Sequence, residues 1–243
     1  MSGEDVFARA KADIAGQSDP GGQGGTVALL QRVCGAAVKT LSASGAGVTV
    51  MTGDGVRGVS AASDPGSARL EELQFTLGEG PCVDAYASRR PVLIPDLADG
   101  AMTRWPVYAP AVVDNGVRAV FAFPLQVGAA RLGVLDVFRE RAGALTADEL
   151  WHAVLLADAT VAALLDQHER HDGGDAGRAD MDEAIEDRAV LFQAQGMVMV
   201  QLGVSIGEAM ARMRAYAYAE NRRLSDVAHD VVGRRLRFDQ DHR

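Results

Sequence analysis

Residues 118–125 read RAVFAFPL and residues 131–138 read RLGVLDVF, and these two segments decide the fold. Both are apolar and rich in the β-branched and aromatic residues that favour strands. The loop between them is short and contains glycine, which favours a reversal of the chain. The two segments therefore predict the antiparallel centre of a β-sheet.

Further strands are predicted before this centre. Residues 46–52 (AGVTVMT) and 56–63 (VRGVSAAS) are short strand-like runs, and Gly53-Asp54-Gly55 between them is typical of a hairpin turn. Residues 91–97 (PVLIPDL) predict another strand, which its prolines restrict to a strand start or a sheet edge.

Helical patterns surround these strands. Residues 26–41 repeat apolar side chains at spacings of three and four, with Thr26 as a helix cap. The capping box Thr146-x-x-Glu149 opens a second, long helix. This order of helices and strands predicts an α+β domain over residues 26–168, with helices packed against an antiparallel sheet.

The segments that flank this domain have a different composition. Residues 15–25 (AGQSDPGGQGG) are rich in Gly, Ser, Asp and Pro, so residues 1–25 are predicted to be a flexible leader. Residues 169–180 (ERHDGGDAGRAD) contain three glycines and a cluster of charges, which indicates a linker or a helical joint. We expect one long helical path, from about residue 146 through 202, to cross this joint.

Residues 181–238 show no strand pattern and predict an all-α three-helix bundle. Within them, residues 192–202 (FQAQGMVMVQL) are apolar over so much of the helix circumference that more than one face must be packed. A capping box, Ser205-x-x-Glu208, begins the next helix. Heptad spacing predicts a homodimeric coiled-coil seam on the long helix, formed by Met181, Ile185, Phe192, Met199 and Leu202.

Composition restricts the class of protein. The 243 residues are 48% hydrophobic and contain no run of the roughly 20 apolar residues that a membrane span needs. The N-terminus carries acidic residues and no apolar signal segment, so we expect a cytoplasmic protein. The net charge is −9, yet between Asp187 and Arg237 eight arginines stand against five acidic residues. The C-terminal region is therefore the basic part of an acidic chain.

The C-terminal residues resemble a known family. The pattern consists of Ala194-x-Gly196 followed by Met199, then Gly203-x-Ser205, Glu208-Ala209, Arg214 four residues before Tyr218, Asn221, and Leu224-x-x-Val227-Ala228. It is similar to the ANTAR domain, the RNA-binding output module of bacterial transcription antitermination regulators. That family commonly has lysine where this chain has Gln195, so the resemblance implies weaker phosphate binding at this position.

This resemblance implies that the partner is RNA, bound at hairpin loops in nascent transcripts. RNA loops are recognised by stacking of splayed bases on aromatic or guanidinium planes, with arginines on the phosphates. The alternative is that the arginines form a solvated helix face and the tyrosines form the edge of the core. The candidate RNA-binding residues are Gln193, Ala194, Gln195, Gly196, Arg212, Arg214, Tyr218, Asn221, Arg222 and Arg223.

The N-terminal residues resemble a second family. FTLGEGPCVDAYASRRPVLIPDL (75–97) and RWPVYAPAVVDNGVRAVFAFPLQVGAARLGVLDVF (104–138) are similar to a GAF domain of the kind that precedes ANTAR modules in actinobacterial regulators. GAF domains bind small ligands in a cavity over the sheet or serve as dimer scaffolds, so an unidentified small-molecule ligand is implied. The candidate pocket residues are Val50, Gly80, Cys82, Val83, Tyr86, Trp105, Phe121 and Phe123.

Two sequence features could carry further chemistry. Gly78-Glu79-Gly80-Pro81-Cys82 precedes a predicted helix, and we interpret it as a tight loop with Cys82 as a small buried residue. The alternatives are an anion-binding turn or a thiol of lowered pKa. His168-x-x-His171 has a helical spacing that fits a metal but lies at the joint, where a solvated linker is expected. The sequence therefore predicts no metal site and no cofactor.

These observations predict a signal-responsive RNA-binding antiterminator that is not an enzyme. One alternative is a DNA-binding factor, since three short helices with a basic surface also fit a helix-turn-helix. A second is a protein-interaction scaffold, which Gln195, Gln201 and the acidic total charge favour. A third is a GAF-fold enzyme such as a free methionine sulfoxide reductase, which would need Cys34 and Cys82 to act as a reactive pair.

Overall fold

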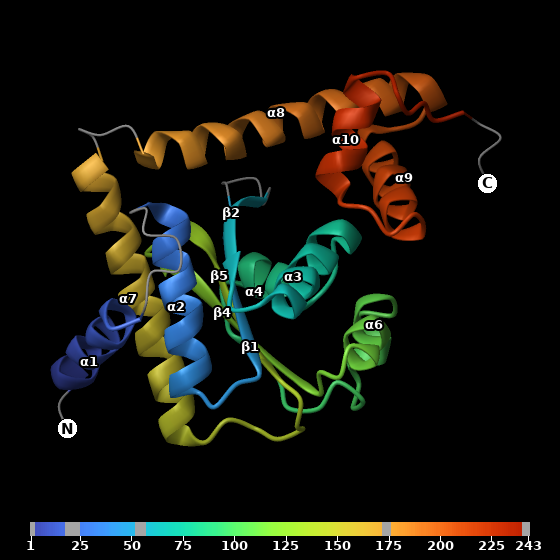
Figure 1. The fold of residues 1–243 in the computed structure, drawn as a ribbon. Helices are drawn as coiled ribbons and strands as arrows, with labels where there is room; N and C mark the ends of the chain where they lie inside the picture. The colour runs from blue at the N-terminus through green and yellow to red at the C-terminus, as the bar shows by residue number, and fades with distance from the viewer. Residues whose placement is uncertain (1–2, 18–24, 52–56, 172–175, 240–243) are drawn as a thin grey trace.

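Figure 1 shows the computed structural model, which describes residues 3–17, 25–51, 57–171 and 176–239. The predicted turn at residues 53–55 and the glycine-rich residues 18–24 lie outside the described residues. The side chains of residues 167–188, which include His168, His171, Met181 and Ile185, lie outside the description as well.

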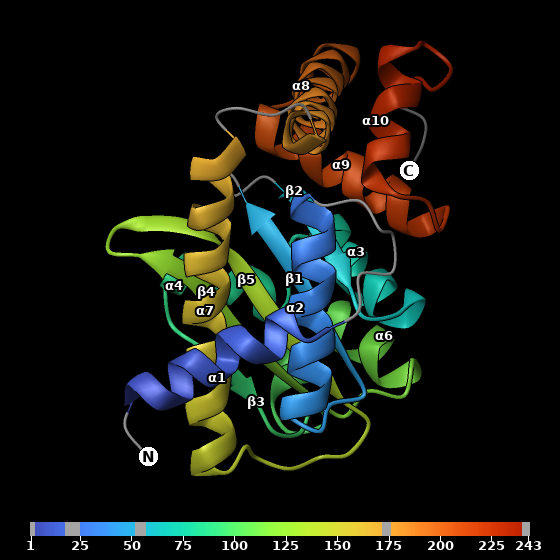
Figure 2. The ribbon, with the colours of Figure 1, turned by 60° about the vertical axis from the view of Figure 1, so that its left-hand side comes forward.

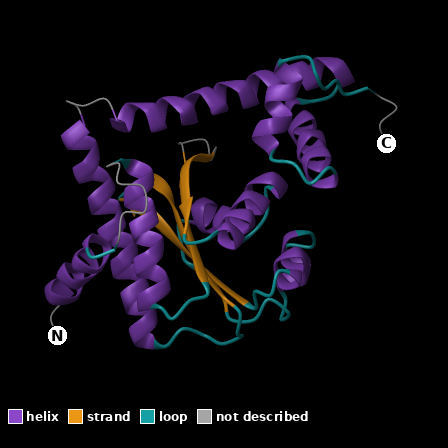
Figure 3. Cartoon of the chain, in the orientation of Figure 1, coloured by secondary structure: helices purple, strands orange, loops and turns teal. Residues whose placement is uncertain are grey.

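A five-stranded antiparallel sheet forms the centre of the N-terminal domain (Figure 3). Its order is β2-β1-β5-β4-β3, and Phe121 lies opposite Val137 in the pair that the sequence placed at the centre. The edge position predicted for the proline-flanked strand is confirmed, since that strand pairs with β4 alone. The strands are β1 (Gly45–Met51), β2 (Arg57–Ala62), β3 (Val92–Ile94), β4 (Ala119–Val127) and β5 (Ala130–Arg139).

Helices cover both faces of this sheet, and Figure 2 shows one helical layer in front of the strands. Because side chains alternate along a strand, Leu135 and Val137 join the core on one face while Val134 and Phe138 join the core on the other. The first face is covered by α2 (Thr26–Thr40) and α7 (Ala147–His171), and α1 (Gly3–Ala15) packs on these two helices. The second is covered by α3 (Pro65–Leu77), α4 (Pro81–Ser88), α5 (Ala101–Arg104) and α6 (Tyr108–Asp114).

The prediction that the whole leader is flexible is wrong, because residues 3–15 form helix α1. Ala10 and Ile14 are buried in the first core, and Phe7 packs against the same core. These positions lie three and four residues apart and place one apolar stripe on the helix, which α2 and α7 cover.

The capping box at the start of α7 is confirmed. Thr146 donates its backbone N–H to Glu149 Oε2 at 2.8 Å, and the Glu149 N–H donates to Thr146 Oγ1 at 3.2 Å. Arg139 also contacts the Glu149 carboxylate. The backbone hydrogen bond from Thr146, followed by Arg139, lowers the pKa of Glu149.

The C-terminal domain consists of α8 (Ala176–Leu202), α9 (Ile206–Ala219) and α10 (Leu224–Val232). Ala194, Val198, Met213 and Leu224 are among its fully buried residues. The single helical path expected through residue 202 is two helices, α7 and α8, which run in different directions (Figure 1). Within the described residues, no single helix has both the length and the apolar character that a membrane span requires.

The two domains contact each other through α3. Phe75, near the end of that helix, packs against the core of the C-terminal domain. Helix α3 contacts α9, and α8 passes over β2. The N-terminal domain therefore contacts the C-terminal helices through α3, the edge strand β2 and α2.

Candidate ligand cavity and nucleic-acid interface

Three side chains that can carry charge meet between the sheet and helices α3 and α4. Glu71 lies on α3, Cys82 lies in the first turn of α4, and Asp136 lies on β5. One ligand atom from each lies within 4.8 Å of the others. Glu71, Cys82 and Asp136 are 4%, 3% and 0% exposed, so the cluster is enclosed by protein. We call these three residues the acidic cluster.

Neighbouring polar groups hold the acidic cluster in place. Thr49 Oγ1 donates a hydrogen bond to Glu71 Oε2 at 2.8 Å. Gln74 Nε2 donates to Asp136 Oδ2 at 3.1 Å, while Gln74 Oε1 accepts the Cys82 backbone N–H at 2.8 Å. Gln74 thus connects the start of α4 to the central strand β5.

Glycines lie beside the acidic cluster at the two places where the side chains of Glu71 and Gln74 approach the backbone. A Cβ atom added to Gly47, which is opposite Asp136 in the sheet, would lie 2.5 Å from Glu71 Oε1. A Cβ atom on Gly80 would lie 2.6 Å from Gln74 Oε1. Glycine at these two positions therefore provides the space that Glu71 and Gln74 occupy.

Burial changes the acid–base properties of the site. Loss of solvent raises the pKa of Asp136 well above its ordinary value, and the nearby charge of Glu71 raises it further. Loss of solvent also raises the pKa of Tyr108, with further contributions from Asp136, Glu71 and Cys82. Among the described residues, neither Tyr108 Oη nor Asp136 Oδ1 has a hydrogen-bond partner.

A cavity of about 80 Å³ opens from the acidic cluster toward the C-terminal domain. Arg214 of α9 lines it and lies against Gly78, the residue that ends α3. Burial lowers the pKa of Arg214, and its Nε has no hydrogen-bond partner among the described residues. The cavity is lined by Thr49, Met51, Glu71, Gln74, Phe75, Gly78, Cys82, Val83 and Arg214.

The predicted pocket residues divide between the two faces of the sheet. Cys82, Tyr86 and Trp105 belong to the core under α3 to α6, and Cys82 and Val83 line the cavity. Gly80 is the residue before α4. The prediction is wrong for the three other residues, because strand alternation places them in the core under α2 and α7: Val50, Phe121 and Phe123.

The interpretation of the loop before α4 is confirmed. Gly80 is the N-cap, Pro81 occupies the first turn and Cys82 is buried. Cys34 lies in the core on the opposite face of the sheet, so the two thiols are separated by the strands. Burial raises the pKa of the Cys34 thiol strongly. This separation removes the reactive cysteine pair that the sulfoxide reductase alternative needs.

Sequence reasoning missed Glu71, Gln74 and Asp136. A signal for one of them was present, since Asp136 interrupts an otherwise apolar central strand, where a charged residue requires a compensating partner. Glu71 and Gln74 lie on a helix of mixed composition, and only the folded arrangement places them beside Asp136.

In the C-terminal domain the candidate RNA-binding residues fall into two groups. Gln193, Arg212, Tyr218, Asn221 and Arg223 are exposed. Arg222 forms an ion pair with Asp230, which lowers the pKa of that carboxyl. Gly196 is half-buried within α8.

The expectation that Ala194 and Gln195 face RNA is wrong. Ala194 is fully buried, and Gln195 is 7% exposed. Gln195 Nε2 donates a hydrogen bond to the backbone oxygen of Ile206 at 2.8 Å, which ties α8 to the first turn of α9. Gln195 is therefore a packing residue of this domain.

The Gln195→Ala variant tests this role. We expect it to lower the free energy of unfolding of the C-terminal domain by about 0.5–1.5 kcal/mol, because the hydrogen bond between Gln195 and the backbone oxygen of Ile206 is lost. The slope of RNA affinity against salt concentration should not change, since no phosphate contact is lost. Urea denaturation and binding at several salt concentrations measure the two effects. A changed slope at unchanged stability would contradict the packing role.

Two residues of the predicted dimer seam pack within their own domain, which reduces the surface that they offer to a second copy of the chain. Met199 and Leu202 pack against the core of their own domain, while Phe192 is 41% exposed. Val200, on the same helix, is 75% exposed. A homodimer through the exposed part of α8 stays a prediction.

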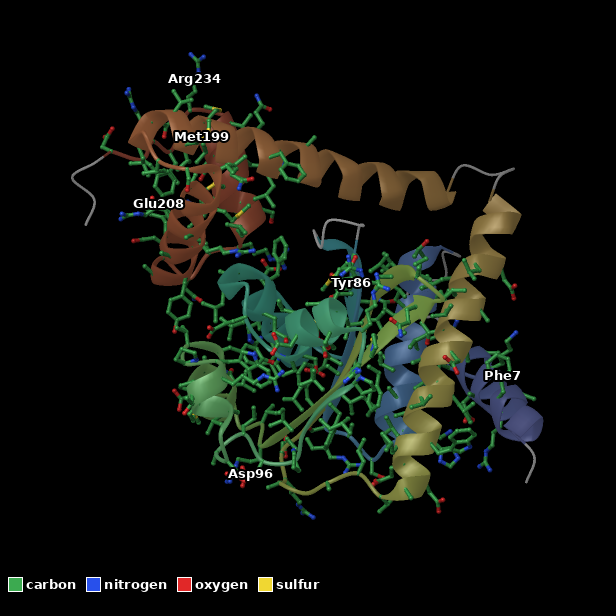
Figure 4. The ribbon with its side chains drawn as sticks, turned by 180° about the vertical axis from the view of Figure 1, so that it is seen from behind. Phe7, Tyr86, Asp96, Met199, Glu208 and Arg234 are labelled. Carbon is green, nitrogen blue, oxygen red and sulfur yellow. The ribbon has the colours of Figure 1, made fainter. Side chains whose placement is uncertain are left out.

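The face of α9 and α10 that points toward the N-terminal domain borders a hollow of about 1180 Å³. Tyr218, Asn221, Arg222 and Arg223 line one side of it, and residues of α2, α3 and β2 line the other. Figure 4 shows Arg234 at the opposite end of the C-terminal domain, pointing away from the sheet. We call the surface formed by Arg214, Tyr218, Asn221 and Arg223 the inner face.

An α+β domain with a small cavity beside a buried acidic cluster, followed by a helical domain with a basic and aromatic face, is the arrangement of a two-domain sensor and output protein. The chain belongs to the GAF domain family, whose model matches residues 26–165, and an ANTAR domain follows at residues 179–232. The predicted pairing of these two domains is confirmed. GAF and ANTAR are regulatory domains, so the chain is a regulator with a GAF input domain.

The chain is similar to solved GAF domains, the first of which supports the fold. The GAF domain of a phosphoenolpyruvate-protein phosphotransferase from Coxiella burnetii is 16% identical, with a TM-score of 0.51, and the match covers 69% of this chain and 95% of that one. The corresponding domain from Acinetobacter is 12% identical, with a TM-score of 0.49 and coverage of 71% and 99%. A comparison with curated proteins found no match.

Proposed function

We propose that this protein is a signal-responsive RNA-binding regulator that controls transcription termination through its ANTAR domain. The observation that carries the proposal is the inner face, which places Tyr218, Asn221 and Arg223 together on a domain of an RNA-binding family. An exposed tyrosine offers a plane for a splayed base, and arginines offer contacts to phosphates. Hairpin loops in nascent transcripts present both groups.

The GAF domain supplies the input by holding Arg214, while the exposed residues of the inner face lie across the hollow from it. Arg214 is held against Gly78 and is withdrawn from any RNA. Its guanidinium is desolvated, and its Nε donates no hydrogen bond to offset that cost within the described residues. A ligand that favours an arrangement in which the inner face is uncovered would therefore raise RNA affinity.

Binding to a hairpin RNA, to its unstructured counterpart and to duplex DNA of equal length, all at equal salt, tests this function. We expect preference for the hairpin. The double variant Arg212→Ala with Arg223→Ala should reduce the slope of log affinity against log salt concentration by about 1.4, since each lost phosphate contact on single-stranded RNA contributes about 0.7. Both arginines are exposed, so the fold should not change.

The control is Arg234→Ala, which removes an exposed arginine at the opposite end of the domain. It should leave the salt slope unchanged. Preference for duplex DNA would instead support the DNA-binding alternative. Absence of nucleic-acid binding, in a variant whose inner face has been uncovered, would support the scaffold alternative.

A further inference from the structure

We propose that Glu71, Cys82 and Asp136 form a binding site for a divalent transition metal ion of the Zn²⁺ or Fe²⁺ type. The inference deepens the proposed function, because it assigns a ligand class to the cavity beneath Arg214. It revises the expectation from the sequence that no metal site is present. Apart from Asp136 in its apolar strand, no local pattern indicated the site, since its residues come from α3, α4 and β5.

The first argument is the donor set. Two carboxylates and a thiolate are ligands that Zn²⁺ accepts, and a mixed oxygen and sulfur set does not suit Mg²⁺ or Ca²⁺, which take oxygen alone. With bond lengths of about 2.0–2.3 Å, two ligand atoms of one tetrahedral ion lie about 3.3–3.7 Å apart. The three ligand atoms all lie within 4.8 Å of one another, so small side-chain rotations bring them onto one ion.

The second argument is the polar groups that the protein leaves without partners. Asp136 Oδ1 and Tyr108 Oη are completely buried, and neither has a hydrogen-bond partner among the described residues. Burial of a polar group without a hydrogen-bond partner is unfavourable. A metal ion provides the missing partner for Asp136, and its own bound water provides one for a nearby hydroxyl.

The third argument is the shape of the site. Gly47 leaves room for Glu71, whose Oε2 accepts from Thr49, while Gln74 orients Asp136. Hydrogen bonds of this kind fix the direction of metal ligands. The cavity of about 80 Å³ lies beside the cluster and offers space for a fourth, exchangeable ligand such as water.

The position of the site connects it to the output domain. Arg214 and Glu71 line the same cavity, so the charge of the cluster acts on the guanidinium. Two carboxylates and a thiolate must lose their protons to bind the ion, and a divalent ion then leaves the site with one net negative charge. Metal binding would therefore change the charge that faces Arg214 across the contact between the domains, and the ion would be the signal.

Cobalt binding to the full-length protein tests the proposal. Protein stripped with a chelator is titrated with Co²⁺, and a thiolate-to-cobalt charge-transfer band in the near-ultraviolet is the expected result. Cys82→Ser should abolish this band. Cys34→Ser is the matched control, because Cys34 is also buried but lies on the opposite face of the sheet, and it should retain the band. Zn²⁺ should displace the cobalt.

Asp136→Asn tests the carboxylate separately. It keeps the shape of the side chain, and we expect metal affinity to fall by at least about 100-fold, since loss of a group that only orients a ligand already costs about 10–100-fold. Circular dichroism without metal shows whether the variants fold. Absence of the band in the wild type, or a band that survives in folded Cys82→Ser protein, would overturn the proposal. These outcomes do not depend on RNA binding, so they leave the proposed function unaffected.

Discussion

Replacing Gly133 with alanine is expected to destabilise the GAF domain by about 3 kcal/mol or more, which is exceptional for the addition of one methyl group. Gly133 lies on β5 and pairs with Val50 of β1. A Cβ atom at this position would lie 2.9 Å from Val50 Cα and 3.0 Å from the Thr49 carbonyl carbon, and closer still to the Thr49 oxygen. These are backbone atoms, which cannot move aside as a flexible side chain can. The steric overlap is therefore relieved only if β1 and β5 separate.

Gly207→Ala is the matched control. Gly207 lies within α9, and a Cβ atom there would meet nothing within 4 Å. Alanine should stabilise this helix by about 0.5–1 kcal/mol because it is the stronger helix former. Thermal unfolding followed by circular dichroism compares the two variants. A small effect of Gly133→Ala, similar in size to that of Gly207→Ala, would show that the two strands can separate at little cost.

The sequence predicts those parts of the fold that depend on local pattern. The central hairpin, the proline-flanked edge strand and the capping box at Thr146 and Glu149 are all confirmed. Each depends on residues close together in the chain, where periodicity, proline geometry or a side chain three residues away determines the conformation.

The features that the sequence did not reveal depend on which elements pack together. Phe121 and Phe123 were expected in the ligand pocket because they are aromatic and lie on a central strand, but alternation places them on the opposite face. Which face carries the cavity is decided by helices α3 and α4. The acidic cluster unites residues that lie 11 to 65 positions apart, so no local pattern marks it.

The same reason explains the error at Gln195. The position of Gln195 within a family motif on a basic domain predicted that it faces RNA. The fold instead brings the backbone oxygen of Ile206 to within 2.8 Å of its side chain, and this requires the turn between α8 and α9. A polar residue in an apolar helix can therefore bind a neighbouring helix as readily as a ligand.

Phe75→Asp is expected to raise RNA affinity about 10–100-fold. Phe75 is the apolar contact of α3 with the core of the C-terminal domain, and it lines both the small cavity and the larger hollow. Loss of its burial, together with the cost of placing a carboxylate in the contact, should disfavour the covered arrangement by about 1.5–3 kcal/mol. Each 1.4 kcal/mol corresponds to a factor of ten in an equilibrium constant. Disfavouring the covered arrangement by this amount should therefore raise the apparent RNA affinity by about 10–100-fold.

The measurement is the affinity of full-length protein for one hairpin RNA. Leu93→Asp is the control, because Leu93 is 40% exposed on the edge strand β3 and lies outside the domain contact. Adding Arg214→Ala to Phe75→Asp should remove most of the gain, since Arg214 can bind RNA only after it leaves Gly78. If the gain persists without Arg214, the exposed residues of the inner face carry binding alone. If Phe75→Asp folds and affinity does not rise, the contact between the domains does not restrain RNA binding.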